Sequence, residues 1–325
     1  MKELENKAVN NKMKIMFVEG ENENIIKAAA KSLKREVCTP MLVGRYEVIL
    51  DTCTKLGINC SDFTIVNSDL YDTESWVEEF YSENTIYSKK KLTRLLKNPL
   101  YFSMMALKYN KCEGVIGGID YTTSEVVMAG QIILGLEDNV STVSSYFIMD
   151  IPNYQSKVGS LIVLSDGGVC VDPTSEELGD IALTTAKSVK QILGWEPRVA
   201  FLSYSTDGSG MSEQTNKIVE ALEYSKKKAP NLCVDGEFQL DAAISPEVAS
   251  KKVKRKSSVA GQANILILPD LNSGNILYKG IQRFAGAKAY GPLLQGFKKP
   301  LYDLSRGSSV EDIYGVIVIM SSSFI

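Results

Sequence analysis

Short apolar runs alternate along the chain with longer stretches whose apolar residues recur at helical spacing. The run KIMFVEG at residues 14–20 predicts a buried strand, and a helical pattern follows it through residues 25–33. Similar runs at residues 41–44, 63–66 and 114–118 predict further strands with helices behind them. Strands that alternate with helices of this length form parallel sheets covered on both faces, so the predicted fold class is α/β.

The alternation of strands and helices restarts near residue 140. SSYFIM, SLIVLSDGG and VAFLSY predict strands of a second sheet, with a long helix over residues 175–193 among them. The final helix, from about Ser308 into GVIVIM, is very apolar, so we expect it to be buried and to return to the first domain. A chain of 325 residues is long for one hydrophobic core, which also favours two domains.

Composition and charge narrow the function classes. With 44% hydrophobic and 23% charged residues the chain is typical of a globular protein, and its net charge of -3 gives no overall attraction to nucleic acid or an anionic membrane. No apolar run reaches the roughly 18 residues of a membrane span, and the start MKELENKAVNNK is too polar for a signal peptide. We therefore expect a cytoplasmic protein that binds neither nucleic acid nor membranes.

The chain contains no histidine, which removes several kinds of catalysis. Ser-His-Asp and Cys-His mechanisms and His-ligated zinc are excluded, so proton transfer falls to Asp, Glu, Lys, Tyr, Cys or the substrate. The six cysteines are scattered without a C-x-x-C pair, and we expect reduced thiols, most of them buried, and no metal site.

Two loops in the last quarter of the chain are suited to a phosphorylated ligand. ILILPDLNSGN and GPLLQGFKKPLYDLSRGSSVEDIY each carry an apolar strand into a loop of small polar residues that opens a helix. Unpaired N–H groups and the helix dipole attract anions at such an end, and Arg306 adds a planar fork of donors. Ser308 and Glu311 have the spacing of a capping box, which puts Asp312 in the first helical turn.

Other charged or glycine-rich segments have two interpretations each. TDGSG at residues 206–210 resembles an anion-binding turn, but such turns are common structural features and Asp207 would repel an anion. The run KKVKRK at residues 251–256 fits a solvated helix end or a dock for a ligand's outer phosphate, and the run at residues 89–91 is treated in the same way.

The chain resembles the phosphate acetyltransferases over essentially its whole length. The resemblance is carried by GEFQLDAAISPEVA, SVAGQANILILPDLNSGN and the segment from residue 291 to 314, and in weaker form by DGGVCVDPTSEELGDIA and LSYSTDGSG. It implies two α/β domains with an interdomain cleft, in an architecture like that of isocitrate/isopropylmalate dehydrogenases. The implied domains are residues 1–140 with 293–325, and residues 141–292.

The resemblance also implies an activity and a set of partners. Enzymes of this kind interconvert acetyl-CoA and phosphate with acetyl phosphate and CoA. They use coenzyme A as a substrate, need no metal or prosthetic group, and are usually homodimers. By matching position, Asp312 takes the CoA thiol proton, Arg306 binds the phosphoryl or acyl oxygens, and Ser305 stabilises the developing charge. Substrate contacts are expected from Asn272, Ser273, Asn275, Thr122 and Thr123, for which helix capping is the alternative role.

Three places depart from the family's charge pattern. The family has arginines where this chain has Met128 and Asn24, and its Arg-Lys segment is shortened here to YSKKKLTR, where Lys89, Lys90 or Lys91 could compensate only as point charges. The enzyme is the favoured interpretation because Ser305, Arg306 and Asp312 are intact. The alternatives are a divergent paralogue that binds CoA or a partner without the chemistry, and a phosphate butyryltransferase-like activity on a longer acyl chain.

Overall fold

The structure, a computed structural model, describes residues 1–323 of the chain. The chain divides into two compact units. One unit comprises Met1–Gly135 and the segment from Phe297 onward, and the other comprises Leu136–Gly296. Each unit is built on its own sheet with helices around it, which confirms the predicted α/β class.

The first unit is built on a five-stranded parallel sheet in the order β11-β4-β1-β2-β3. Its central strands are short apolar runs, and all four residues of β4 are buried. The strands are β1 (Lys14–Phe17), β2 (Thr39–Val43), β3 (Thr64–Val66), β4 (Gly114–Gly117) and β11 (Leu301–Asp303). The helices are α1 (Lys2–Asn11), α2 (Glu23–Lys34), α3 (Tyr46–Leu56), α4 (Glu74–Glu83), α5 (Lys89–Leu95), α6 (Pro99–Lys108), α7 (Thr123–Ile133) and α13 (Val310–Ser322), with a 3₁₀ turn, η1, at Cys60–Asp62.

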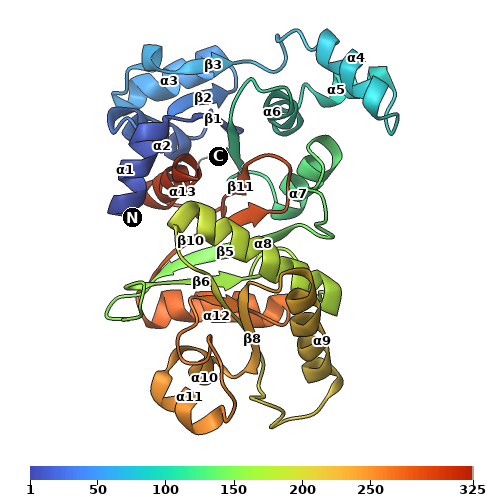
Figure 1. Ribbon diagram of the computed structural model, residues 1–325. Helices are drawn as coiled ribbons and strands as arrows, with labels where there is room; N and C mark the ends of the chain where they lie inside the picture. The colour runs from blue at the N-terminus through green and yellow to red at the C-terminus, as the bar shows by residue number, and fades with distance from the viewer. Residues whose placement is uncertain (324–325) are drawn as a thin grey trace. The chain divides into compact units, whose positions relative to one another are not determined.

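The C-terminal helix α13 is buried in the first unit along most of its length, from Gly315 to Ser322. It packs against α1 and α2, and these three helices lie side by side in Figure 1. Its side chains from Ile317 to Met320 are all buried. A helix that is apolar all round is stable only when neighbours cover every face, which explains why the last residues return to elements formed at the start of the chain.

The second unit is built on a six-stranded mixed sheet in the order β10-β5-β6-β9-β7-β8. β5 runs antiparallel to both β10 and β6, and the remaining pairs are parallel. The strands are β5 (Ser144–Asp150), β6 (Leu161–Ser165), β7 (Arg198–Leu202), β8 (Cys233–Phe238), β9 (Ile265–Ile267) and β10 (Lys288–Gln295). The helices are α8 (Ser175–Leu193), α9 (Glu213–Lys228), α10 (Leu240–Ile244), α11 (Pro246–Lys252) and α12 (Leu271–Phe284).

One helix cap differs from the sequence prediction. The capping box of α13 is formed by Ser309 and Asp312, so the predicted pairing of Ser308 with Glu311 is wrong. The chain carries serine at both 308 and 309 and an acid at both 311 and 312, so spacing alone allows either register. Packing decides it, because Ser308 is buried and Glu311 forms an ion pair with Lys31 at 2.6 Å.

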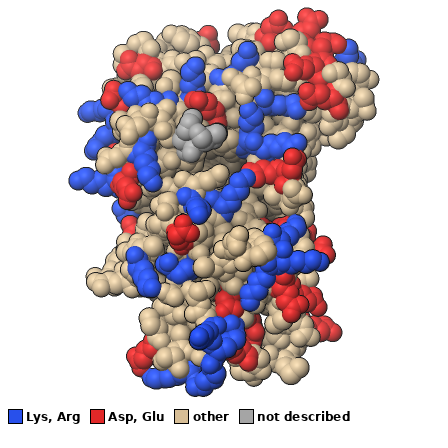
Figure 2. All heavy atoms as spheres, viewed as in Figure 1, with Lys and Arg blue, Asp and Glu red and all other residues tan. Residues whose placement is uncertain are grey.

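The cysteines and surface charges follow the expected pattern. Four of the six thiols are buried, Cys170 is half-buried and Cys233 is exposed, and all six are free. Burial raises the pKa of Cys38 and Cys112 to about 12, which makes both poor nucleophiles. Figure 2 shows basic and acidic side chains interspersed over the visible face, with acidic ones gathered over α4. Among residues 1–323, no helix has the length and apolarity to cross a bilayer.

Candidate active site

Three adjacent strands of the first unit end at one edge of its sheet. β11, β4 and β1 are parallel neighbours, and after each of them the chain passes through a short loop into a helix, α13, α7 and α2 respectively. Carboxyl ends of parallel strands meet at the same edge, where α/β proteins bind their ligands. Five predicted residues lie in these loops or the helix starts that follow them, namely Ser305, Arg306, Asp312, Thr122 and Thr123.

Arg306 lies exposed in the loop between β11 and α13. Within residues 1–323, its guanidinium group takes part in no hydrogen bond or ion pair. The positive charge of Arg306 acts on the nearby Glu125. Hydrogen bonds from Thr122 lower the pKa of Glu125, and the charge of Arg306 lowers it further. The five N–H donors of Arg306 are therefore available to an anionic ligand.

The loop around Arg306 is a closed turn. The Ser308 amide donates to the Ser305 carbonyl at 2.9 Å, which brackets Arg306 and Gly307 between two serines. Ser305 is exposed, like Arg306, so its hydroxyl is open to solvent. A short, closed turn limits the positions that the guanidinium can reach, which favours a defined anion site.

Asp312 holds the start of α13. Its Oδ2 accepts from the Ser309 amide at 2.9 Å and from the Ser309 hydroxyl at 2.7 Å, while its own amide donates to Ser309 Oγ at 3.2 Å. These bonds fix the carboxylate at the helix N-terminus six residues beyond Arg306, as predicted. The second oxygen, Oδ1, takes no part in the capping box and is available for another proton donor.

Thr122 and Thr123 begin α7 and have different partners. Thr122 forms a capping box with Glu125, which is the alternative role given for it from the sequence, and its hydroxyl donates to Glu125 at 2.8 Å. The hydroxyl of Thr123 donates to the buried Asp303 at 2.5 Å. Both hydroxyls therefore serve the local structure, and any contact with substrate stays a prediction.

The residues at the family's arginine positions are placed as follows. The Asn24 side chain, in the first turn of α2, donates to the Ser308 carbonyl at 3.4 Å and so contacts the loop that carries Arg306. Met128 on α7 is 53% exposed, so this position carries a neutral side chain at the surface. Lys89 is paired with Glu78, and Lys91 lies 4.0 Å from the ring centre of Tyr87.

Asn272, Ser273 and Asn275 lie in the second unit, and the prediction that they occupy a loop is wrong. All three belong to the first turns of α12, which begins at Leu271 because the Asp270 side chain accepts from the Ser273 amide at 2.8 Å. The Asn275 side chain donates to the Gly167 carbonyl at 3.3 Å. Asn272 is exposed, so its amide is open to a ligand.

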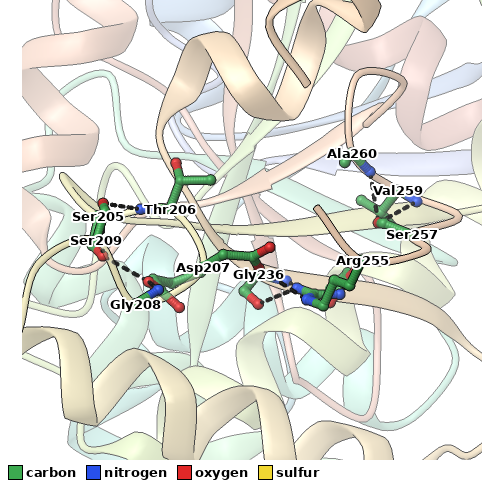
Figure 3. A network of polar contacts seen from close by, with 12 residues as sticks. Ser205, Thr206, Asp207, Gly208, Ser209, Gly236, Arg255, Ser257, Val259 and Ala260 are labelled. Atoms are coloured by element: carbon green, nitrogen blue, oxygen red, sulfur yellow. Dashed lines mark hydrogen bonds and ion pairs between the residues drawn. The ribbon is translucent and has the colours of Figure 1, made fainter. Parts of the chain in front are cut away.

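The donors in and beside the TDGSG turn of the second unit are already bonded to side chains of the same unit. The Gly208 amide and the Ser205 hydroxyl both donate to Glu237, at 2.8 and 2.7 Å. The Thr206 amide donates to the Ser209 hydroxyl at 3.0 Å, a contact drawn in Figure 3. Because these donors already hold an internal carboxylate and hydroxyl, the structural interpretation of the turn is favoured over anion binding.

Arg255 ties this turn to the neighbouring strand. Its guanidinium contacts Asp207 at 2.9 Å and the Gly236 carbonyl at 3.0 Å, residues that are labelled in Figure 3. It also contacts Asp235 at 2.7 Å. Burial raises the pKa of Asp235, but hydrogen bonds from Arg255 and Ser257 outweigh this effect and lower it overall. Within the KKVKRK run, this arginine is therefore neither a fully solvated charge nor a free phosphate ligand.

Replacing Arg255 with alanine is expected to destabilise the second unit by about 1–2 kcal/mol. The change removes the Arg255 contact from Asp235, which is only 7% exposed, and leaves it the longer ion pair with Lys226 at 3.5 Å; the partial exposure of Arg255 also moderates the loss. Thermal or urea unfolding measures the effect. The adjacent, exposed Lys254→Ala is the matched control and should stay within about 0.5 kcal/mol of the unchanged protein. Equal stability of both variants would show that the Arg255 pairs contribute nothing.

Sequence reasoning missed two buried acids, Glu19 and Asp303. Glu19 follows β1 and Asp303 ends β11, so both lie at the strand edge that carries the predicted residues. The available signal was a carboxylate directly after an apolar run, in FVEG and in PLYD.

The second unit has a cavity of about 580 Å³ and the first unit has one of about 400 Å³. None of the eight predicted site residues lines either cavity.

Comparisons with known proteins identify the family of the chain. A model of the family described as Phosphate acetyl/butaryl transferase matches residues 1–321. The phosphate acetyltransferase of Clostridium acetobutylicum is 41% identical over 96% of this chain and 94% of its own. The crystal structure of a phosphotransacetylase from Streptococcus pyogenes has 37% identity and a TM-score of 0.92, covering 99% of this chain and 96% of its own.

A structure with little sequence identity shares the same fold. The 4-hydroxythreonine-4-phosphate dehydrogenase from Klebsiella pneumoniae is only 10% identical, yet it has a TM-score of 0.56 over 96% of this chain and 100% of its own. The fold is therefore shared with dehydrogenases, whereas the close relatives define an acyltransferase. The chain belongs to the Phosphate acetyl/butaryl transferase family, which confirms the predicted phosphate acetyltransferase activity.

Proposed function

We propose that the enzyme interconverts acetyl-CoA and phosphate with acetyl phosphate and CoA by direct attack of the CoA thiol or thiolate on the acyl phosphate. The unpaired Arg306 guanidinium, held beside the start of α13, is the observation that carries this proposal. In this scheme CoA is a substrate, and no metal or prosthetic group takes part.

Arg306 and Ser305 would stabilise the charge that develops during transfer. Attack on the acyl carbon places negative charge on the acyl oxygen, and the leaving phosphate carries further charge. A guanidinium forms paired hydrogen bonds to such oxygens, and a hydroxyl on the same turn can add a third. These donors have the largest effect if they bind the tetrahedral intermediate more tightly than the substrate.

Asp312 would accept the thiol proton through the oxygen that the capping box leaves available. A thiol with a pKa near ~8.5 is mostly protonated at neutral pH, so a positioned carboxylate raises the fraction of attacking thiolate or takes the proton as the bond forms. Asn24, which contacts the Ser308 carbonyl, helps to fix the loop in place of the family's arginine.

The acyl chain is tested by following thioester formation from CoA with acetyl phosphate and with butyryl phosphate. We expect acetyl phosphate to be preferred, by about tenfold or more in kcat/KM if the pocket discriminates by chain length. A preference for butyryl phosphate would support the butyryltransferase-like alternative. No turnover with either compound, while CoA still binds, would point to a paralogue without the chemistry.

The remaining expectations rest on the family resemblance. A homodimer in the cytoplasm stays the predicted assembly and location. Sedimentation of the purified protein tests the first of these.

A further inference from the structure

Two buried carboxylates flank one glycine at the strand edge of the first unit. Glu19, 8% exposed, accepts from the Gly118 amide through Oε1 at 2.8 Å. Asp303, fully buried, fills the space where a side chain on Gly118 would project, since a Cβ there would lie 1.9 Å from its Oδ1. Gly118 also has a φ of +106°, which favours glycine. Both acids therefore touch the backbone of Gly118.

Each of these carboxylates has one oxygen without a hydrogen-bond donor. Within residues 1–323, Glu19 Oε2 and Asp303 Oδ1 are two of only three buried side-chain polar atoms that lack a hydrogen-bond partner. The other oxygen of Asp303 accepts from Thr123, and the other oxygen of Glu19 also accepts from the Asp120 amide at 3.3 Å. Unpaired buried polar atoms are costly, so these two oxygens need an explanation.

The surroundings offer no positive charge to the pair. Among residues 1–323, no lysine or arginine forms an ion pair with Glu19 or Asp303. The titratable neighbours are Asp120 and Tyr121 beside Glu19, and the only polar side chain on Asp303 is Thr123 from α7. Two ionised carboxylates without a cation would repel each other in a medium of low dielectric constant.

Burial and like charge act on the two acids in the same direction. Burial raises the pKa of Asp303 to about 7, the charge of Glu19 adds to this effect, and the hydrogen bond from Thr123 opposes it. Burial also raises the pKa of Glu19. A proton on Asp303 removes one of the two buried negative charges and turns its carboxylate into a group that can also donate a hydrogen bond.

We propose that Asp303, which contacts Gly118 beside the buried Glu19, holds a proton, and that Asp303 in this state is a positioning residue for the loop and helix starts of the active site. The proposal rests on the function proposed above. Asp303 lies two residues before Ser305 and is bonded to Thr123 at the start of α7, so the pair ties the ends of β1, β4 and β11 together. Loss of the proton would put two negative charges behind the loop that carries Arg306 and weaken its hold on phosphate.

Infrared difference spectroscopy tests for the proton without relying on activity. The whole protein is compared at about pH 5.5 and about pH 8.5, and the carbonyl stretch of a protonated carboxyl group should disappear at the higher pH. Asp303→Asn should lack this band. A wild-type spectrum identical to that of Asp303→Asn would overturn the proposal, whatever the acetyl-transfer assay shows. If Asp303→Asn does not fold, Glu19→Gln takes its place, and removal of the like charge should then move the ionisation to lower pH.

Kinetics separates positioning from simple structural support. Asp303→Asn imitates the protonated form, so its kcat/KM for phosphate should stay within about threefold of wild type near pH 6, whereas Asp303→Ala should lose about tenfold or more. Above pH 7 the KM for phosphate should rise in wild type and not in Asp303→Asn. Parallel pH profiles of wild type and Asp303→Asn would contradict the positioning role.

Stability gives a second readout that is independent of catalysis. Because the pKa of Asp303 is raised from its ordinary value of 3.8 to about 7, the folded protein keeps a proton that the unfolded chain has released in this interval. Folding stability from this group is therefore fully present below about pH 4 and declines as the pH rises through 7. The melting temperature of wild type should fall relative to that of Asp303→Asn across this window, and a constant difference would count against the proton on Asp303.

Discussion

Replacement of Arg306 by alanine is expected to lower kcat/KM for acetyl transfer by about 10²–10³-fold. The guanidinium is the exposed, unpaired group of its loop, and removing one preorganised donor from an oxyanion site typically costs about this much. Arg306→Lys should recover only part of the loss, because an ammonium group does not form paired bonds to a phosphoryl or carboxyl group. Steady-state rates of thioester formation measure both variants.

The same substitution should leave folding stability nearly unchanged. Arg306 has no partner to lose within residues 1–323, so its removal should shift the free energy of unfolding by less than about 0.5 kcal/mol. Arg283→Ala is the matched control for net charge. It removes an exposed arginine from α12, in the other unit, and should retain full activity. If Arg306→Ala kept its activity within about threefold, Arg306 would not bind the reacting oxygens.

Replacement of Asp312 by asparagine is expected to reduce kcat by about 10²–10⁴-fold at neutral pH. Asparagine retains an oxygen that can accept from Ser309, so the capping box survives while the proton acceptor is lost. The deficit should shrink as the pH approaches the thiol pKa near ~8.5, because the thiolate then forms without a base. A pH profile of kcat measures this recovery.

Ser309→Ala separates the structural role of Asp312 from its chemical role. It removes the hydroxyl that bonds to the carboxylate, so the start of α13 should lose about 1 kcal/mol while the carboxylate stays in place. We expect its kcat to remain within a few-fold of wild type. Equal kinetic losses in Ser309→Ala and Asp312→Asn would instead assign Asp312 to helix capping alone.

Local patterns predicted several elements and one helix cap correctly. The helix expected over residues 175–193 is α8, and the cap at Thr122 is as predicted, because both depend on interactions within a few residues. The same kind of reasoning failed at α13 and α12. Adjacent serines and adjacent acids left two registers for the cap of α13, and Asp270 began α12 earlier than the loop-like composition of LNSGN suggested.

Long-range pairs could not be read from spacing. Arg255 bonds to Asp207, which lies 48 residues away in the sequence, and that contact removes the repulsion expected of Asp207 in the TDGSG turn. Asn24 reaches the Ser308 carbonyl across 284 residues. Neither pair has a local signature, because the helices and loops that carry these residues come together only after the sheets have formed.

The sequence by itself determined the α/β class, the family and the residues of the SRGSSVED loop, since these depend on periodicity, composition and segments that are contiguous in the chain. Only the tertiary structure decided that Glu19 and Asp303 both contact Gly118. Sheet order places β4 between β1 and β11, and burial then turns two ordinary acids into a pair whose charges cannot both be solvated. Proximity and desolvation are properties of the folded chain, and no local pattern encodes either of them.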